Sequence, residues 1–346
     1  MKILVLGGSR FLGKAFVEEA LKHNHEITVF NRGNHNNPFA NIEFIKGDRF
    51  GNLSGLRGRY WDAVLDTSGY VPSTVRKSTE LLSGHAGQYT FISSISVYKD
   101  WSQENMDESA PILSISPEKA DELSSGATGP LMEYYGEFKA LCEREAERNM
   151  PGRVLNVRAG LLVGPDDYSD RFTYWINRVS RGGRVLAPGS PKRKIQFIDI
   201  RDLGKWLLFM MVNKSAGTYN ATGPESPMEM GELLETIKAV SGSNAEIEWV
   251  DETFLLERKV APWTEMPLWL PEKNGDSGNS AKGGFSFNID KALRSGLLFS
   301  PIETTVRDTL TWDLTRNCKE LKAGISFDKE KILLKEWEEN KAESRS

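Results

Sequence analysis

A tyrosine and a lysine in the middle of the chain have the types and spacing needed for proton transfer. Tyr135 and Lys139 are four residues apart in a segment with a helical apolar face, so they lie one turn apart on the same side of a helix. A phenol titrates at about pH 10, but a neighbouring ammonium can lower its pKa by ~2 to 3 units for only ~3 to 4 kcal/mol. A serine hydroxyl from the segment Ser93–Tyr98 would hold a substrate oxygen while Tyr135 gives or takes its proton. The spacing alone also fits an ordinary surface pair, so the surrounding elements must decide between the two interpretations.

The chain begins with the pattern of a strand, a glycine-rich turn and a helix. Lys2–Leu6 is a continuous β-prone run typical of a parallel strand buried on both faces, and a helical apolar face follows from Leu12. Here Gly7 permits a tight turn, Gly8 lets the backbone approach a pyrophosphate, and Gly13 lets helix and strand pack closely. An ordinary βα turn would also explain the glycines alone. In this context we predict that the turn contacts a dinucleotide cofactor through Gly7, Gly8, Ser9, Arg10, Phe11, Leu12 and Gly13.

The end of the second expected strand bears on the type of cofactor. Glu26–Phe30 runs into Asn31 and Arg32, where NAD-selective sites carry an acidic residue that binds the ribose 2′-hydroxyl. An arginine at this place instead accommodates a 2′-phosphate, and Arg10 offers a second cation. We therefore predict NADP(H) in preference to NAD(H). The alternative is that both arginines are solvated loop charges.

Further strands place polar residues at the same edge of the expected sheet. Three runs, at 42–45, 63–65 and 88–92, end in turn residues, and ligands of open α/β sheets bind beyond the carboxyl ends of the strands. The fold class predicted is α/β, a Rossmann-type doubly wound parallel sheet. Cofactor contacts at this edge are predicted from Asn31, Arg32, Asp48, Arg49, Thr67, Ser68, Gly69 and Ser93.

Composition excludes several other classes of protein. The 346 residues carry 44 Lys plus Arg and 48 Asp plus Glu, a net charge of -4, so there is no excess of positive charge for nucleic acid. Two cysteines, Cys142 and Cys318, cannot support a disulfide framework, and four histidines form no metal-ligand pattern. No run approaches the ~20 apolar residues that cross a bilayer. We expect a cytoplasmic protein without metal or membrane contact, whose partner is a small-molecule substrate.

The motifs together resemble those of a known family. They occur in family order in the segments FISSISVY (91–98), YGEFKALCE (135–143), RAGLLVGP (158–165), FIDIRDL (197–203) and GTYNATG (217–223), after the glycine turn. The chain resembles the short-chain dehydrogenase/reductases, in particular the extended or atypical members grouped as NAD-dependent epimerase/dehydratases. The resemblance implies that Tyr135 is the catalytic acid/base, that Lys139 activates it and binds the nicotinamide ribose, and that Ser94 is the catalytic serine, with Ser96 as an outside candidate. It also allows a homodimer through the helix of Tyr135.

Several positions depart from the family pattern. Arg10 replaces the middle glycine, as in an atypical branch that resembles chloroplast stem-loop RNA-binding proteins. Ile95-Ser96 stands where sugar-nucleotide 4,6-dehydratases carry Asp-Glu, which disfavours that dehydration. Ile195 stands where many nucleotide-sugar epimerases have an arginine for the diphosphate, although Arg193 or Lys194 could act from a shifted register. The fold and the redox chemistry therefore transfer better than a nucleotide-sugar substrate.

The resemblance further implies two interleaved domains, because a late strand returns to the first sheet. The predicted parts are a dinucleotide-binding domain (1–167 plus 194–223), a smaller mixed α/β C-terminal substrate lobe (168–193 plus 224–316) and a charged tail (317–346). Substrate contacts are predicted from Ser96, Arg171, Tyr174, Trp175 and Trp263, although Trp175 also fits core packing and Trp263 a surface loop. The tail is predicted to be an amphipathic helix that buries Ile332, Leu333 and Trp337.

Three functions remain open at this stage. The first is an NAD(P)-dependent oxidoreductase that reduces a ketone or oxidises a secondary alcohol. The second is a sugar 4-epimerase that retains its NAD. The third is a non-enzymatic cofactor-sensing or RNA-binding scaffold, suggested by Arg10 and disfavoured by the acidic net charge.

Overall fold

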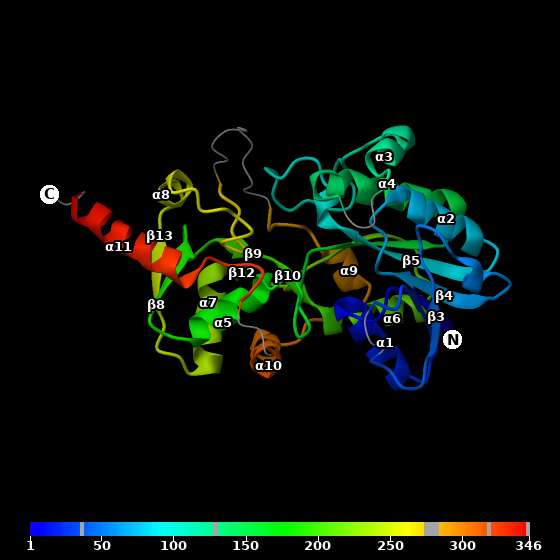
Figure 1. The fold of residues 1–346 in the computed structure, drawn as a ribbon, viewed down its shortest axis with the longest axis horizontal. Helices are drawn as coiled ribbons and strands as arrows, with labels where there is room; N and C mark the ends of the chain where they lie inside the picture. Colours follow the sequence, from blue (N-terminus) through cyan, green and yellow to red (C-terminus); the bar gives the residue numbers. More distant parts are fainter. Residues whose placement is uncertain (35–37, 127–130, 273–283, 317–319, 344–346) are drawn as a thin grey trace.

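A computed structural model describes residues 1–34, 38–126, 131–272, 284–316 and 320–343, so Cys318 lies outside the described residues. Its centre is a seven-stranded sheet in the order β11-β6-β5-β4-β1-β2-β3, and every pairing within it is parallel (Figure 1). The strands are β1 (Lys2–Leu6), β2 (Glu26–Asn31), β3 (Glu43–Lys46), β4 (Trp61–Asp66), β5 (Ala86–Ser94), β6 (Val154–Ala159) and β11 (Gly217–Ala221). The predicted doubly wound α/β fold is confirmed. The order reverses between β1 and β4, and ligands of such sheets bind beyond the strand ends at this point.

The sheet is covered on both faces, which explains the uninterrupted apolar strands. In β1, Ile3 and Val5 belong to one hydrophobic cluster, and Leu4 and Leu6 to another, and all four are fully buried. The first cluster lies under α1 (Phe11–Lys22) and α6 (Ile200–Val212), and the second under α2 (Pro72–Leu82) and α4 (Tyr135–Asn149). Each pair of helices packs side by side, on opposite faces of the sheet (Figure 1).

A smaller lobe with its own core follows the sixth strand. It contains α5 (Arg171–Ser180), β8 (Arg184–Pro188), α7 (Met230–Ser241), β13 (Glu246–Val250), α8 (Glu252–Glu257) and α10 (Ile302–Thr315). Strands β8 and β13 pair in parallel, and α5, α7 and α10 pack together. Short elements complete the described chain: β7 (Leu161–Val163), β9 (Lys194–Ile195), β10 (Phe197–Asp199), β12 (Met228–Glu229), α3 (Pro117–Leu123), α9 (Asp290–Arg294) and single 3-10 turns at 54–56, 95–97 and 132–134.

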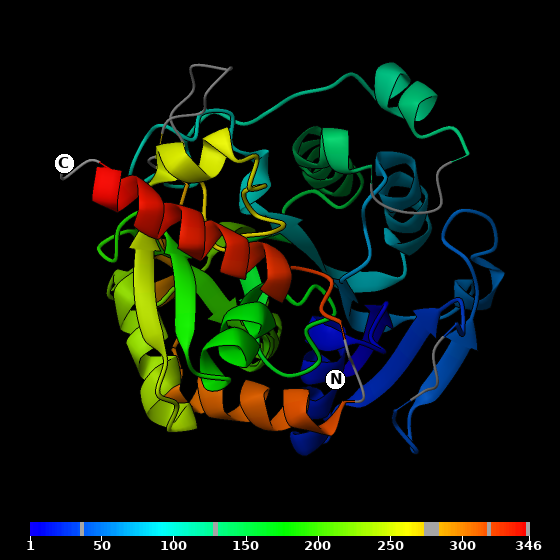
Figure 2. The same cartoon turned by 60° about the vertical axis from the view of Figure 1, so that its left-hand side comes forward.

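The C-terminal helix α11 (Phe327–Glu343) lies across the smaller lobe (Figure 2). Glu330 is buried, where it accepts hydrogen bonds from Arg178 Nε at 2.6 Å and from the Leu186 amide at 2.9 Å. Leu333 and Leu334 enter the core of the lobe, whereas Ile332 is 57% exposed. The prediction that Ile332 is buried was therefore wrong, because the Glu330 contacts fix the rotation of the helix and turn Leu334 inward instead.

Candidate active site

The glycine turn has the geometry that a close-packed βα unit requires. Gly7 has φ of 115°, and a Cβ there would lie 2.3 Å from Thr67 Oγ1. A Cβ on Gly13 would lie 2.7 Å from the Cα of Gly8, so only glycine lets α1 start this close to β1. Arg10, at the N-cap of α1, has an extended backbone (φ -145°) that any residue adopts, which explains how arginine replaces the middle glycine of the family pattern.

The residues at the end of β2 divide into two roles. The Asn31 amide donates hydrogen bonds to Gly7 O at 3.1 Å and to Ser9 Oγ at 3.2 Å, so this side chain supports the shape of the glycine turn. Arg32 is exposed, and the stem of Lys46 lies 3.4 Å from the Cβ position of Gly33. The ends of β2 and β3 therefore carry two neighbouring cations, Arg32 and Lys46. Lys46 is not among the residues predicted to bind the cofactor.

The three predicted catalytic residues are brought together at the carboxyl end of β5, one strand from the switch point between β4 and β1. Ser94 is the last residue of β5, Tyr135 is the first of α4, and Lys139 follows one turn later. The Lys139 ammonium is buried, where it donates hydrogen bonds to Gly69 O at 2.8 Å and to Ile92 O at 2.7 Å. It lies 5.8 Å from the centre of the Tyr135 ring. The backbone carbonyls thus hold Lys139 beside the tyrosine.

Burial determines the protonation of this site. It raises the pKa of Tyr135 to about 12, although hydrogen bonding with Ser94 and the positive charge of Arg171 oppose the rise. It lowers the pKa of Lys139 to about 8, because the charged ammonium is removed from water. The pKa of Tyr135 is thus raised, whereas the sequence predicted that Lys139 would lower it. At neutral pH Tyr135 therefore carries its proton.

Two further tyrosines border the catalytic residues. Tyr70, directly after Gly69, lies with its ring centre 4.8 Å from Lys139 Nζ, and burial together with hydrogen bonding to Tyr168 raises its pKa. Tyr168 lies in the loop between β7 and α5 and contacts the glycine turn. Neither tyrosine is predicted to belong to the site, because each stands in a turn where the sequence shows no helical or strand periodicity.

Two predicted cofactor residues point their side chains elsewhere. The Arg49 guanidinium is buried against Asp66, with N–O distances of 2.5 and 2.8 Å. Ser93 donates a hydrogen bond to Glu143 on α4 and is 3% exposed. The side chains of Arg49 and Ser93 are therefore held by partners within the protein, and their contacts with a cofactor stay predictions.

Other predicted cofactor residues do line the end of the sheet. The hydroxyls of Thr67 and Ser68 each donate to Leu6 O at 3.1 Å, so they join the ends of β1 and β4 at the crevice. Asp48 accepts a hydrogen bond from the Phe50 amide at 3.0 Å in the turn after β3.

The predicted substrate residues fall into two groups. Tyr174 and Trp175 are 3% and 0% exposed in the core of the smaller lobe, where the Trp175 indole donates to Pro267 O at 2.8 Å. Both side chains pack within the lobe, because the apolar face of α5 turns toward α7 and α10. This arrangement matches the core packing that the sequence also allowed for Trp175. The Arg171 guanidinium lies 5.2 Å from the centre of the Trp263 ring, and both side chains are partly exposed.

Ser96 lies beside Ser94, the predicted catalytic serine. Its hydroxyl accepts a hydrogen bond from Ser94 Oγ at 3.1 Å, and its amide donates to the same oxygen at 3.1 Å. Ser96 thus orients the Ser94 hydroxyl.

Three residues bear on the expected position of a substrate diphosphate. Ile195 is fully buried in the smaller lobe. Arg193 binds Glu252 and the carbonyl of Leu270, so its guanidinium already has a counter-charge. Lys194 is exposed at the start of β9.

Among the described residues, no group of three or more His, Cys, Asp or Glu side chains could hold a metal ion. None of the helices in the described parts of the chain is long and apolar enough to cross a membrane.

The parallel sheet, the glycine turn and the assembled Ser94, Tyr135 and Lys139 define a dinucleotide-binding α/β protein with a short-chain dehydrogenase type of site. A family model, described as the NAD dependent epimerase/dehydratase family, matches residues 3–222. The chain belongs to this family of NAD-dependent enzymes.

Individual relatives are more distant. A curated relative, the chloroplast stem-loop binding protein of 41 kDa b from Arabidopsis thaliana, is 25% identical over 244 residues, which cover 64% of this chain and 58% of the relative. The chain thus matches less than two thirds of that protein's length.

Solved structures share the fold. UDP-glucuronic acid 4-epimerase from Bacillus cereus, in complex with NAD, has a TM-score of 0.63 at 16% identity and covers 91% of this chain and 100% of its own. The UDP-Glc/GlcNAc 4-epimerase from Campylobacter jejuni has a TM-score of 0.65 at 16% identity and covers 91% and 99%.

Proposed function

We propose that the protein is an NAD(P)-dependent oxidoreductase that transfers hydride between nicotinamide and a carbonyl or secondary alcohol. The observation that carries this proposal is the placement of Ser94, Tyr135 and Lys139 at the end of β5 and the start of α4. These residues lie beside the crevice between β4 and β1. A dinucleotide bound to the glycine turn would place its nicotinamide ring next to them.

The chain's own residues supply binding and proton transfer. The glycine turn packs closely against Thr67 and within itself, and the backbone amides at the N-terminus of α1 would bind the pyrophosphate. The bound dinucleotide would supply or accept the hydride. Tyr135, protonated at neutral pH, donates its proton to the substrate oxygen, and Ser94 holds that oxygen with its hydroxyl.

We propose NADP(H) as the preferred form of the cofactor. Arg32 and Lys46 stand at the ends of β2 and β3, and the position of the usual ribose-binding acid is occupied by Asn31, whose amide supports the glycine turn. A 2′-phosphate there would meet two cations rather than a carboxylate. The family name and the NAD in a similar structure support a dinucleotide of either kind.

A sugar 4-epimerase with retained NAD is the second candidate, and the names of the similar structures favour it. Against a nucleotide-sugar substrate stand the buried Ile195 and the neutralised Arg193. Cofactor behaviour separates the two functions: an oxidoreductase exchanges its cofactor in each cycle, whereas an epimerase oxidises and re-reduces one carbon on the same molecule.

A non-enzymatic RNA-binding scaffold is suggested by the name of the Arabidopsis relative. The net charge of -4 and the assembled catalytic residues argue against it. RNA affinity that falls steeply with salt, in a protein without turnover, would support it.

The deciding experiment is a hydride-transfer screen. The purified protein is mixed with NADPH or NADH, or with the oxidised forms, and with sugars, sugar nucleotides or small ketones, while nicotinamide absorbance is followed. Turnover with exchangeable NADPH, absent in Tyr135→Phe, supports the proposal. Interconversion of a nucleotide sugar without net change in nicotinamide absorbance assigns the epimerase instead.

A further inference from the structure

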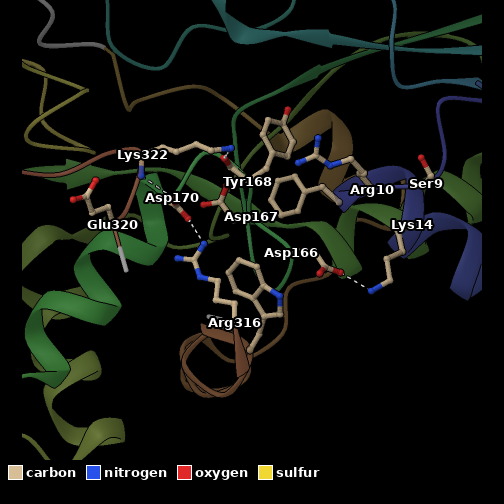
Figure 3. Close-up of a pocket in the computed structure, with 12 residues that line it drawn as sticks. Ser9, Arg10, Lys14, Asp166, Asp167, Tyr168, Asp170, Arg316, Glu320 and Lys322 are labelled. Atoms are coloured by element: carbon tan, nitrogen blue, oxygen red, sulfur yellow. Dashed lines mark hydrogen bonds and ion pairs between the residues drawn. The ribbon is translucent and has the colours of Figure 1, made fainter. Parts of the chain in front are cut away.

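A loop between the two lobes is fixed at both ends. Asp166–Asp170 connects β7 to α5, and we call it the strap. At its start, Asp166 forms an ion pair with Lys14 of α1 at 2.5 Å. At its end, Asp170 forms an ion pair with Arg316 at 2.6 Å, as the dashed lines in Figure 3 show. The strap is therefore tied to the helix that follows the glycine turn and also to the smaller lobe.

The backbone of this region is held in a costly conformation. Asp166 and Asp170 have φ of 69° and 60°, and Phe11, in the glycine turn, has φ of 45°. Residues with a side chain avoid this left-handed region, and such strain persists where surrounding contacts impose it, often at ligand clamps. Here the three residues with positive φ lie on both sides of the contact between the strap and the glycine turn.

That contact is made by Tyr168. Its ring lies edge-on to Phe11, with centres 5.7 Å apart, and the Arg10 guanidinium carbon lies 4.9 Å from the ring centre. Tyr168 also lies near enough to Tyr70 to contribute to the raised pKa of that phenol. Tyr168 thus reaches from the turn after β1 to the turn after β4, which is the crevice where a dinucleotide lies in this type of sheet.

Tyr168 also has room to move. It is 46% exposed, and a cavity of about 390 Å³ adjoins it, lined by Ser9, Lys14, Trp312 and the charged ends of the strap (Figure 3). The ring is held by its contacts with Arg10, Phe11 and Tyr70 rather than by core packing. A side chain with fixed anchors on both sides and open space beside it can swing while its backbone stays in place.

We propose that Tyr168 and Arg10 form a clamp that closes over the pyrophosphate of the bound dinucleotide and slows its release. Arg10, at the N-terminus of α1, presents its charge to the pyrophosphate, and the Tyr168 ring backs the guanidinium from the strap side. Tyr168 is a positioning residue in this assignment, since it acts through Arg10. The inference rests on the proposed binding of a dinucleotide.

The test measures cofactor release rather than turnover. Protein loaded with NADPH is mixed with excess NADP, and the decay of energy transfer from tryptophan to NADPH gives the dissociation rate. We expect Tyr168→Ala to release NADPH roughly tenfold faster, as loss of a partly desolvated cation–π contact implies, and Tyr168→Phe, which keeps the ring, to lie much nearer to the wild type. Tyr60→Ala is the matched control, because Tyr60 is 59% exposed at the opposite end of the sheet, before β4.

A double-mutant cycle tests the partnership. Arg10→Ala should also speed release, and the Arg10→Ala/Tyr168→Ala variant should be no faster than the faster single variant, because both remove one interaction. Melting temperatures without cofactor should stay equal for Tyr168→Ala and Tyr60→Ala, which excludes general unfolding. Release at the wild-type rate from Tyr168→Ala, or additive effects, overturns the clamp while leaving the proposed function intact. Failure of the wild-type protein to bind NADPH or NADH overturns both.

Discussion

Arg158 on β6 and Glu143 on α4 form a buried ion pair, with Arg158 Nη2 2.9 Å from Glu143 Oε2. Glu143 lies one turn beyond Lys139, and it also accepts the hydroxyl hydrogen bond of Ser93. Arg158 Nη1 in turn donates to the Tyr98 hydroxyl at 3.2 Å. The pair therefore fixes the rotation of α4, and with it the direction in which Tyr135 and Lys139 point.

Breaking this pair should be costly. We expect Glu143→Gln to lower the free energy of unfolding by about 3 kcal/mol, because it leaves a buried guanidinium without a counter-charge. Urea unfolding at neutral pH measures the loss. Glu147→Gln is the control on the exposed face of the same helix, since glutamine keeps the acceptor for the Gly152 amide and should change stability little. Equal stability of the two variants would contradict the structural role of the pair.

Tyr135 should be required for turnover and not for cofactor binding. We expect Tyr135→Phe to lower kcat at least ~100-fold on any active substrate, because the proton donor is lost, while the cofactor Kd changes little. Steady-state rates and fluorescence titration measure the two quantities. Tyr134→Phe, one residue earlier and stacked on Phe138 instead, should keep its activity. Retained turnover in Tyr135→Phe would refute the mechanism.

Arg32 should discriminate between the two dinucleotides. We expect Arg32→Ala to weaken NADPH binding roughly 10- to 100-fold, as loss of a charge-assisted phosphate contact implies, and to leave NADH binding nearly unchanged. Fluorescence titrations with both cofactors measure the ratio. The control is Arg57→Ala, because Arg57 is another exposed arginine and lies in the connection between β3 and β4. Equal losses for both cofactors would contradict the assignment of NADP(H).

Lys139 should make stability depend on pH in the alkaline range. Its pKa is lowered to about 8 from 10.5, so between these values the unfolded chain binds more protons than the folded one and stability rises with pH. Between pH 7 and pH 10 the wild type should therefore gain about 2 to 3 kcal/mol relative to Lys139→Met, whose side chain does not titrate. Urea unfolding of both proteins at the two pH values measures the change. A constant difference would show that burial does not perturb this lysine.

The residues whose proximity the sequence predicted belong to local patterns. The glycine turn and the Tyr135–Lys139 spacing are recognisable because strand, turn and helix each have a period, and the structure brings these residues together. The direction in which a side chain points is harder to predict from the sequence than the element that carries it. Ser93 and Ser94 are neighbours in β5 and must point to opposite faces, but only the presence of Glu143 on α4 decides which serine faces the crevice.

The partners of Arg49 and of the α5 aromatics could not be predicted, for one shared reason: they come from other parts of the chain. Arg49 follows a strand end, as a cofactor residue would, yet its partner Asp66 comes from a different strand. Tyr174 and Trp175 lie close to a substrate turn in sequence, but helix packing within the smaller lobe buries them. Tyr168 stands in a loop without periodicity, so its contact with the glycine turn depends on the tertiary fold alone.

The interleaving of the two lobes also bears on how the protein is made. The edge strand β11 pairs with β6, yet it is synthesised about 60 residues later, after α5 and β8 of the smaller lobe and after α6. During translation at roughly 5 to 20 residues per second, β6 is therefore an unpaired edge for several seconds. Such an edge is a template for pairing with other chains, so the nascent protein passes through an aggregation-prone stage that ends when Gly217–Ala221 leaves the ribosome.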